Sequence, residues 1–198
     1  MGFSGHLVFA RSNRPLLEAP VFDSIDEVLK ATVHTWESRP GGWQTLQFVS
    51  GTWDDADLPA LVEWSRAPAC VADVSDSSLA LVTGLDTTGQ RWQAWLNLDI
   101  AAGLLVKEPE DLEDQLLWLD TPEFHDAVRH KRAELGAEIP TDAEGAVAWA
   151  TAASVPVTPQ TVRIEELLRS HETFAEDLFS TLLDQLGFPQ ATQPSLES

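Results

Sequence analysis

The sequence predicts a single α+β domain, with a mainly antiparallel five-stranded sheet and a C-terminal helical layer packed against it. One observation is the stretch Ala69–Asn97, where three short runs rich in Val, Leu and Trp are separated by loop-forming residues. Another is a change near residue 99, after which helix-start signals replace strand patterns. The 198 residues suit one domain, with a sheet-rich half over 1–99, a helical half over 100–187 and a disordered tail over 188–198.

Five runs are predicted as strands, and the last three form an antiparallel meander. They cover residues 6–10, 43–49, 70–74, 79–85 and 91–96. The run 79–85 is mostly apolar on both faces, which predicts a central strand. In the run 91–96, Trp92 faces the predicted core, whereas Trp95 lies among polar residues. We favour a helix or loop that covers Trp95; the alternative is an exposed aromatic anchor for a ligand or partner.

Two helices are predicted in the first half of the chain. Ser24 and Glu27 have the spacing of a capping box and predict a helix over 25–36. Acidic residues at 54, 55 and 57 are favourable at a helix N-terminus and predict a short helix over 57–66. Both helices should lie near the sheet.

The second half contains the start signals of further helices. The helix that begins at Thr121 should end near Gly136, and the last helix should cover 171–186 with a broad apolar stripe facing the core. The starts are predicted at Asp99, at the acidic run 108–114, at Thr121 with Pro122, at Thr141 with Glu144, at Thr158 with Pro159, and at Ser170.

The chain is strongly acidic. Thirty-two Asp and Glu against twelve Lys and Arg leave a formal charge of −20, which repels phosphate backbones and favours basic partners. Nucleic acid is therefore not expected as a partner. Residues 1–99 carry a net −7 and residues 100–198 a net −13. We favour a solvated helical surface as the explanation over an acidic docking face.

The single cysteine and the absence of targeting signals predict a cytoplasmic protein. Cys70 lies inside a predicted strand, so we expect a buried structural thiol and no internal disulfide. The N-terminus has no signal-peptide pattern, and no apolar run approaches the roughly 18 residues of a membrane span. Membrane binding is not expected.

No catalytic residue, metal ligand or cofactor is predicted. His171 and Glu172 begin like the HExxH zinc motif, but Ala175 stands where the second histidine is required. Gly-x-Ser-x-Gly, P-loop and GxGxxG patterns are absent. Paired acids such as Asp54 and Asp55 are too common in this chain to indicate acid–base catalysis.

Two groups of residues are candidates for a ligand or partner site. The chain has eight Trp and no Tyr; most indoles should be packed in the core, but Trp43, Trp53 and Trp95 could line a groove. The only basic cluster contains His125, Arg129 and Arg132 and could bind a carboxylate or phosphate. We favour the alternative, in which Glu123 and Asp126 form ion pairs with this cluster along one helix.

These observations favour a non-catalytic interaction or regulatory module whose acidic surface binds a basic protein. An immunity-like protein that masks a basic toxin belongs to this class. The alternative is a small-molecule-binding protein or an enzyme with a Trp-lined pocket, with the cluster from His125 to Arg132 at its polar end. The sequence does not predict an oligomeric state.

Three segments resemble uncharacterised proteins of high-GC actinobacteria. They are GHLVFARS from Gly5, LALVTGLDTTGQRWQAWLN from Leu79, and FAEDLFSTLLDQLGFP from Phe174. The resemblance covers most of the chain and implies a bacterial cytoplasmic origin. It implies no catalytic residue.

Overall fold

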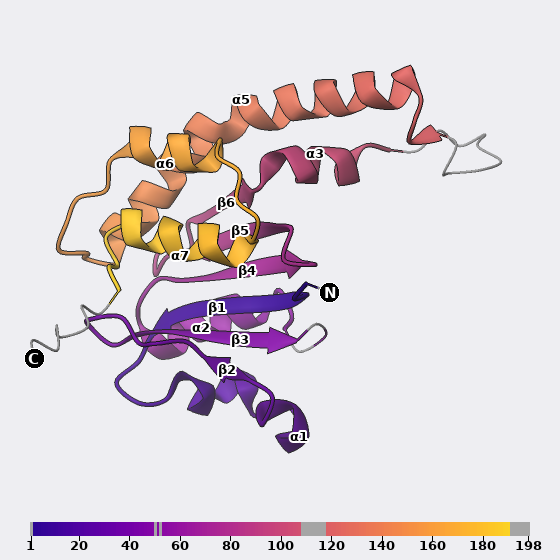
Figure 1. Ribbon diagram of the computed structural model, residues 1–198. Coiled ribbons are helices and arrows are strands. Elements are labelled where there is room, and N and C mark those ends of the chain that lie inside the picture. Colours follow the sequence, from indigo (N-terminus) through magenta and orange to yellow (C-terminus); the bar gives the residue numbers. More distant parts are fainter. Residues whose placement is uncertain (1, 50, 52, 108–117, 191–198) are drawn as a thin grey trace, which may run out of the picture.

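One antiparallel sheet of six strands organises the protein (Figure 1). This computed structural model describes residues 2–49, 51, 53–107 and 118–190. The strand order is β2-β3-β1-β4-β5-β6, and every neighbouring pair is antiparallel. The predicted α+β class is confirmed, but the sheet has six strands where five were expected. The strands are β1 (Gly5–Arg11), β2 (His34–Thr35), β3 (Trp43–Val49), β4 (Ala69–Ser75), β5 (Leu79–Leu85) and β6 (Arg91–Leu96).

The predicted meander is present as β4, β5 and β6. The turn between β5 and β6 depends on Gly89, which has a φ of +88°, a conformation that other residues rarely adopt. Asp86 stabilises the same turn, because its carboxylate accepts hydrogen bonds from the backbone N–H groups of Thr88 and Gln90 at 2.8 and 2.9 Å. Local turn chemistry therefore sets this hairpin.

The sixth strand corrects the predicted helix over 25–36. Helix α1 (Glu27–Lys30) is a single turn, and its cap is Asp26, which accepts a hydrogen bond from the Val28 N–H at 2.6 Å. The predicted capping box at Ser24 is therefore wrong. The chain then pairs as β2 with Leu46 and Gln47 of β3. The run from Thr32 to Thr35 is rich in β-branched residues, which favour an edge strand over helix continuation.

The other helices surround the sheet. Helix α2 confirms the short helix predicted over 57–66. Two 3-10 helices precede α1, namely η1 (Leu16–Glu18) and η2 (Pro20–Phe22). The remaining helices are α2 (Asp57–Ser65), α3 (Leu98–Leu105), α5 (Pro122–Ala152), α6 (Thr161–Leu168) and α7 (Ala175–Gln185).

Helix α5 corrects the prediction of two helices separated near Gly136. Thr121 caps it as expected, accepting from the Phe124 N–H at 3.2 Å, but the helix continues through Pro140 for 31 residues. Proline removes one backbone hydrogen bond and crowds the carbonyl four residues earlier. One buried face continues across this break and keeps the helix intact; it comprises Leu135, Ile139, Ala143, Ala146 and Ala150.

Three other helices start away from their predicted caps. Helix α3 follows Asn97, which has a left-handed backbone, so Asp99 lies inside the helix. Helix α6 follows Gln160, and α7 follows Phe174. None of the three has a side-chain cap, and packing sets their limits in place of local capping. The helical segment predicted from the acidic run 108–114 lies outside the described residues, apart from Trp118.

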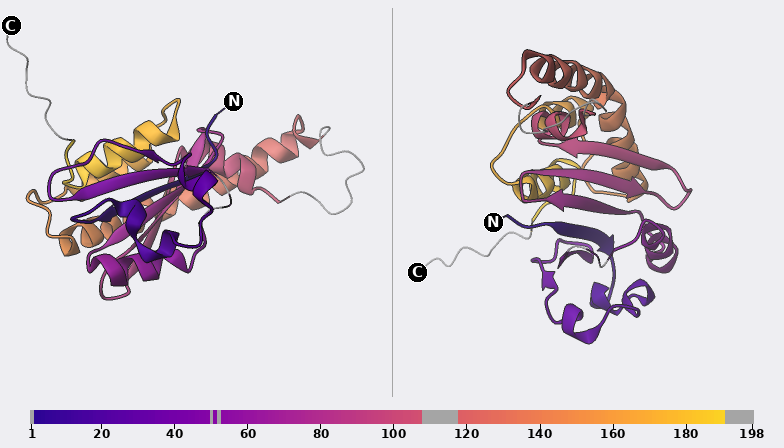
Figure 2. Two further views of the ribbon diagram at one scale, coloured as in Figure 1. Left: turned by 90° about the horizontal axis from the view of Figure 1, so that it is seen from below. Right: turned by 90° about the vertical axis from the view of Figure 1, so that its right-hand side faces the viewer.

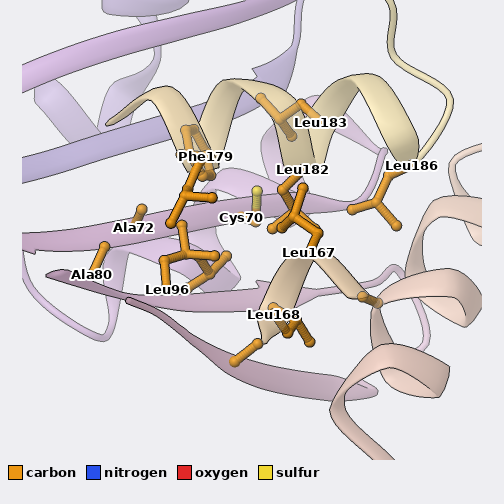
Figure 3. Close-up of a cluster of buried hydrophobic side chains, with 14 of the residues drawn as sticks. Cys70, Ala72, Ala80, Leu96, Leu167, Leu168, Phe179, Leu182, Leu183 and Leu186 are labelled. Carbon is orange, nitrogen blue, oxygen red and sulfur yellow. The ribbon is translucent and has the colours of Figure 1, made fainter. Parts of the chain in front are cut away.

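Two hydrophobic clusters lie on opposite faces of the sheet. Helices α3, α5, α6 and α7 cover one face, on which Leu7 and Phe9 of β1 are buried. Helix α2 with η1 and η2 covers part of the other, on which Val8 of β1 is buried. Figure 2 shows α7 and α2 on opposite sides of the strands. In Figure 3, Phe179 and Leu182 of α7 lie against the strands beside Cys70. The burial of Cys70 confirms the expected structural thiol and raises its pKa.

Trp149 of α5 connects the helical layer to the sheet. Its indole N–H donates to the carbonyls of Ala69 and Leu85, both at 3.1 Å. Its ring lies 5.9 Å from that of Trp92. Trp92 is confirmed as a core residue and fills the space over Gly84, where an added Cβ would lie 2.0 Å from its Nε1.

The C-terminal end of the described chain is part of the core. Phe188 is buried, with its ring 5.1 Å from Phe9 and 4.7 Å from Trp43. Its carbonyl accepts a hydrogen bond from the buried Arg39, which also binds the carboxylate of Asp184. Residue 188, predicted as the first of a disordered tail, is therefore part of the core, and residues 191–198 lie outside the described part.

Candidate functional site

The three tryptophans predicted to line a groove lie apart. Trp43 is buried in the cluster under the helical layer, stacked on Phe9 at 5.0 Å. Trp53 belongs to the cluster on the other face, 6.3 Å from the ring of Phe22. Trp95 is half-buried on β6, paired across the strands with Leu81. The structure does not bring these indoles into one hollow.

The basic cluster on α5 is exposed and pairs with carboxylates. Arg129 lies 2.7 Å from Asp126, and Arg132 lies 2.6 Å from Asp99 of α3. His125 is exposed on the same helix. Arg132 also borders a hollow of about 230 Å³ between α3, α5 and α6. Asp126 forms one ion pair of the kind favoured above, whereas Arg132 pairs with another helix and Glu123 forms no ion pair with a described residue.

The second face of the sheet is open over β5 and β6. Side chains of these strands alternate between buried positions under the helices and partly exposed positions on the other side. On the open side, Gln93 donates to Thr83 at 3.0 Å, and Leu81 lies opposite Trp95. The nearest cover on this face is α2, and two hollows border that helix.

The first hollow contains three arginines and is called the arginine pocket here. It has a volume of about 410 Å³ and lies between the end of β1, the loop after it, and the end of α2. Each arginine is exposed. Its lining is Arg11, Ser12, Asn13, Arg14, Trp64, Ser65, Arg66 and Ala67, with no carboxylate among these residues.

The walls of the arginine pocket are held by specific contacts. Gln44 of β3 anchors the loop after β1: its amide donates to the carbonyls of Ser12 and Arg14 at 3.1 and 2.9 Å, and its oxygen accepts from the Leu16 N–H at 2.9 Å. Gly42 follows the loop closely, since a Cβ there would lie 2.9 Å from the Ser12 carbonyl. The loop is therefore fixed to the sheet.

The second hollow, the α2–β5 hollow, shares Arg66 with the arginine pocket. It has a volume of about 510 Å³, with Pro59, Val62 and Leu85 as its apolar lining. Asp86 also borders it. Burial opposes the ionisation of Asp86, but hydrogen bonds from Thr88, Gln90 and Gly89 outweigh burial and lower its pKa. The Asp86 carboxylate therefore already accepts hydrogen bonds within its own turn.

His6 is a half-buried titratable group on the second face. Burial lowers its pKa, while the charges of Asp73 and Asp55 oppose this effect. Its Nε2 lies 3.7 Å from Asp73, and its buried Nδ1 has no hydrogen-bond partner among the described residues. Within 2–49, 51, 53–107 and 118–190, no group of three or more His, Cys, Asp or Glu could hold a metal ion.

Comparison with protein-family models, curated proteins and solved structures finds no match to this chain. The resemblance to actinobacterial proteins thus stays an expectation. In the described part of the chain, no helix has the length and apolar character needed to cross a membrane.

The residues of the arginine pocket were not predicted as a site. Arg11 and Arg14 appeared as part of a polar turn, and Arg66 as the end of a helix. One local signal was present at the end of α2. Glycine or asparagine is usual in the left-handed position directly after a helix, and in this chain that position is Arg66. Only the packing of α2 beside β1 brings the three together.

Proposed function

We propose that the protein is a non-catalytic interaction or regulatory module of a bacterial cytoplasm, which binds a basic protein partner through its acidic helical layer. Nucleic acid is not proposed as a partner, because the net charge of −20 repels it. The proposal depends most on one observation, the uncompensated acidic pair Glu138 and Asp142 on α5.

Glu138 and Asp142 are one helical turn apart, on the same side of α5. Neither forms an ion pair with a described basic residue. Burial, and then the charge of Glu138, raise the pKa of Asp142 to about 6. The free protein therefore tolerates an unfavourable carboxylate at neutral pH. A cation from a partner would remove this cost, and shifted pKa values of this kind are concentrated at functional sites.

A lysine- and arginine-rich peptide is a direct probe of this surface. Binding is measured by fluorescence anisotropy at two salt concentrations, for the natural protein and for the double variant E138Q/D142N. We expect the variant to bind several-fold more weakly and with a smaller salt dependence. The matched control is D54N/D55N, which removes two exposed charges near the start of α2.

Equal losses in the two double variants would contradict the proposal, because they would indicate general attraction to an acidic protein. NMR gives a second readout. The pKa of Asp142 should fall when the peptide binds, since a nearby cation favours the carboxylate.

The alternative function, small-molecule binding, has one observation in its favour. The arginine pocket contains basic residues beside one indole, that of Trp64, and none of the three indoles predicted to line a groove. An enzyme is not proposed from this hollow.

A further inference from the structure

The charges of the arginine pocket are not balanced locally, although the chain has an excess of acids. Six basic side chains pair with carboxylates: Lys30, Arg39, Arg129, Lys131, Arg132 and Arg169. The other six have no such partner in the part of the chain that the structure describes: Arg91, Lys107 and Arg163 lie apart, whereas Arg11, Arg14 and Arg66 border one hollow. In a protein with 32 acidic residues, three unpaired arginines around one hollow call for a physical explanation.

Two of these arginines are held by uncharged groups. The Nε of Arg11 donates to the Gly41 carbonyl at 3.1 Å, and the Cζ of Arg14 lies 5.1 Å from the ring centre of Trp64. Both contacts position a guanidinium without neutralising it. Arg11 follows Phe9 on the helix-covered face of β1 and borders another hollow beside Gly41 and Trp43 as well. Its terminal nitrogens have no hydrogen-bond partner among the described residues and can form a forked pair of hydrogen bonds to an anion.

The third arginine occupies a costly backbone conformation. Arg66 has φ 52° and ψ 31°, and its N–H donates to the Val62 carbonyl at 2.9 Å, which ends α2. Glycine adopts this left-handed conformation without steric cost, and a side chain there is unfavourable. A residue held in such a conformation supports a functional role for its side chain.

Charge and shape together indicate the class of ligand. A phosphate monoester carries a charge of about −1.5 to −2 at pH 7 and has three acceptor oxygens, which suits three guanidinium groups better than one carboxylate does. The neighbouring α2–β5 hollow, which shares Arg66, offers Pro59, Val62 and Leu85 for the organic part, while Glu63 and Asp86 border it as well. We propose that the arginine pocket binds a small organic phosphate monoester, with its apolar group directed toward the α2–β5 hollow.

The acidic surface of the protein does not prevent this binding. The lining of the arginine pocket contains no carboxylate, and charges farther away than about 8 Å are largely screened at physiological salt. This site is separate from Glu138 and Asp142, so it is independent of the proposed basic partner.

Phenyl phosphate, inorganic phosphate and succinate are suitable probes for isothermal titration calorimetry at pH 7.5. We expect phenyl phosphate to bind with one-to-one stoichiometry and more tightly than inorganic phosphate, and succinate to bind most weakly. The indole N–H signal of Trp64, assigned with W64F, should shift on binding. These readouts do not depend on any enzymatic activity.

R66G is the decisive variant because it separates binding from folding. It should weaken phenyl phosphate binding roughly tenfold or more. Its melting temperature should be unchanged or higher, since glycine suits this backbone conformation. R11Q and R14Q should also weaken binding. The control is R163Q, which removes an exposed charge from α6 and should leave binding unchanged.

Four outcomes would overturn the proposal. The first is no saturable binding of phenyl phosphate up to about 10 mM, an affinity too weak for a specific site. The second is full affinity in R66G, and the third is an equal loss in R163Q. Succinate binding as tight as phenyl phosphate binding would show that the ligand class is wrong. Equal affinities for inorganic and phenyl phosphate would overturn the role of the α2–β5 hollow.

Discussion

On one face of the sheet, the helices α3, α5, α6 and α7 bury side chains of all the long strands, whereas on the other face α2, η1 and η2 cover mainly β1, β3 and β4. The covered face contains Trp149 and Trp92 in close aromatic packing. The partly covered face contains the two hollows beside Arg66 and the open side of β5 and β6. We infer that the covered face supplies most of the stability, and that the partly covered face is free to bind ligands.

The largest expected effect is that of W149A on the covered face. It removes a buried indole and leaves the carbonyls of Ala69 and Leu85 without their donor. We expect a loss of about 3–5 kcal/mol in the free energy of unfolding, measured by urea titration with circular dichroism. The comparison is Trp95, which alternates with the buried residues of β6 and packs against the covered-face cluster only as a partly buried residue. W95A should cost at most about 1.5 kcal/mol. Similar losses in both variants would remove the distinction between the faces.

A smaller loss is expected from G84A, which tests how tightly the covered face is packed. The added Cβ would lie 2.0 Å from Nε1 of Trp92, and Gly145 packs closely against the Cβ of the same tryptophan, where a further Cβ would lie at 2.8 Å. We expect a cost of about 1–3 kcal/mol, the range of overpacked cores. G103A is the control, because a Cβ there meets no atom within 4 Å and alanine is the better helix former. A neutral result for G84A would show that Trp92 can move.

Asp142 should affect stability by about 1 kcal/mol, in a pH-dependent way. Its pKa is raised from 3.8 to about 6, so the folded state keeps a proton that the unfolded state has lost. The contribution of protonated Asp142 to the free energy of unfolding is fully present below pH 3.8 and is lost as the pH rises to about 6. D142N should therefore be more stable than the natural protein at pH 7, by on the order of 1 kcal/mol because the group is half-exposed. The control is E144Q, which makes the same change of charge at an exposed position of α5.

The smallest effect is expected from R129Q, on the exposed part of α5. Its ion pair with Asp126 is fully accessible to water, and such pairs contribute little. Thermal unfolding should differ from that of the natural protein by no more than about 0.5 kcal/mol. A larger loss of stability would mean that the basic cluster of α5 contributes to packing. Residues away from the sheet would then also stabilise the fold.

Local patterns were enough to predict the five long strands and the starts of two helices, α2 and α5. Alternation identified β6, and Thr121 capped α5 as expected. Strand β2 was missed because its two residues depend on pairing with β3 and not on their own propensity. The continuity of α5 through Pro140 was missed because a buried face on both sides of the proline holds the helix together.

The candidate sites were harder to predict than the fold. The side on which Trp43 packs depends on Phe188, which lies far away in the sequence. Arg11 and Arg66 come together only because α2 lies beside β1. The pairing of Arg132 with Asp99 also joins two helices. Sequence spacing predicts contacts within one helix or hairpin. The three contacts just described join different elements, so spacing does not predict them.

The contact between Arg39 and Phe188 has a consequence for folding during synthesis. The cluster on the α2 side uses only residues between Val8 and Leu85, so a nascent chain can assemble it early. The opposite face needs helices as far as α7 and is closed by Arg39 only when Phe188, 149 positions later, has been made. At about 5–20 residues per second, roughly 5–20 s separate these events. For that time an apolar sheet face stays open on the ribosome, which makes the nascent chain a natural client for a chaperone that holds exposed strands.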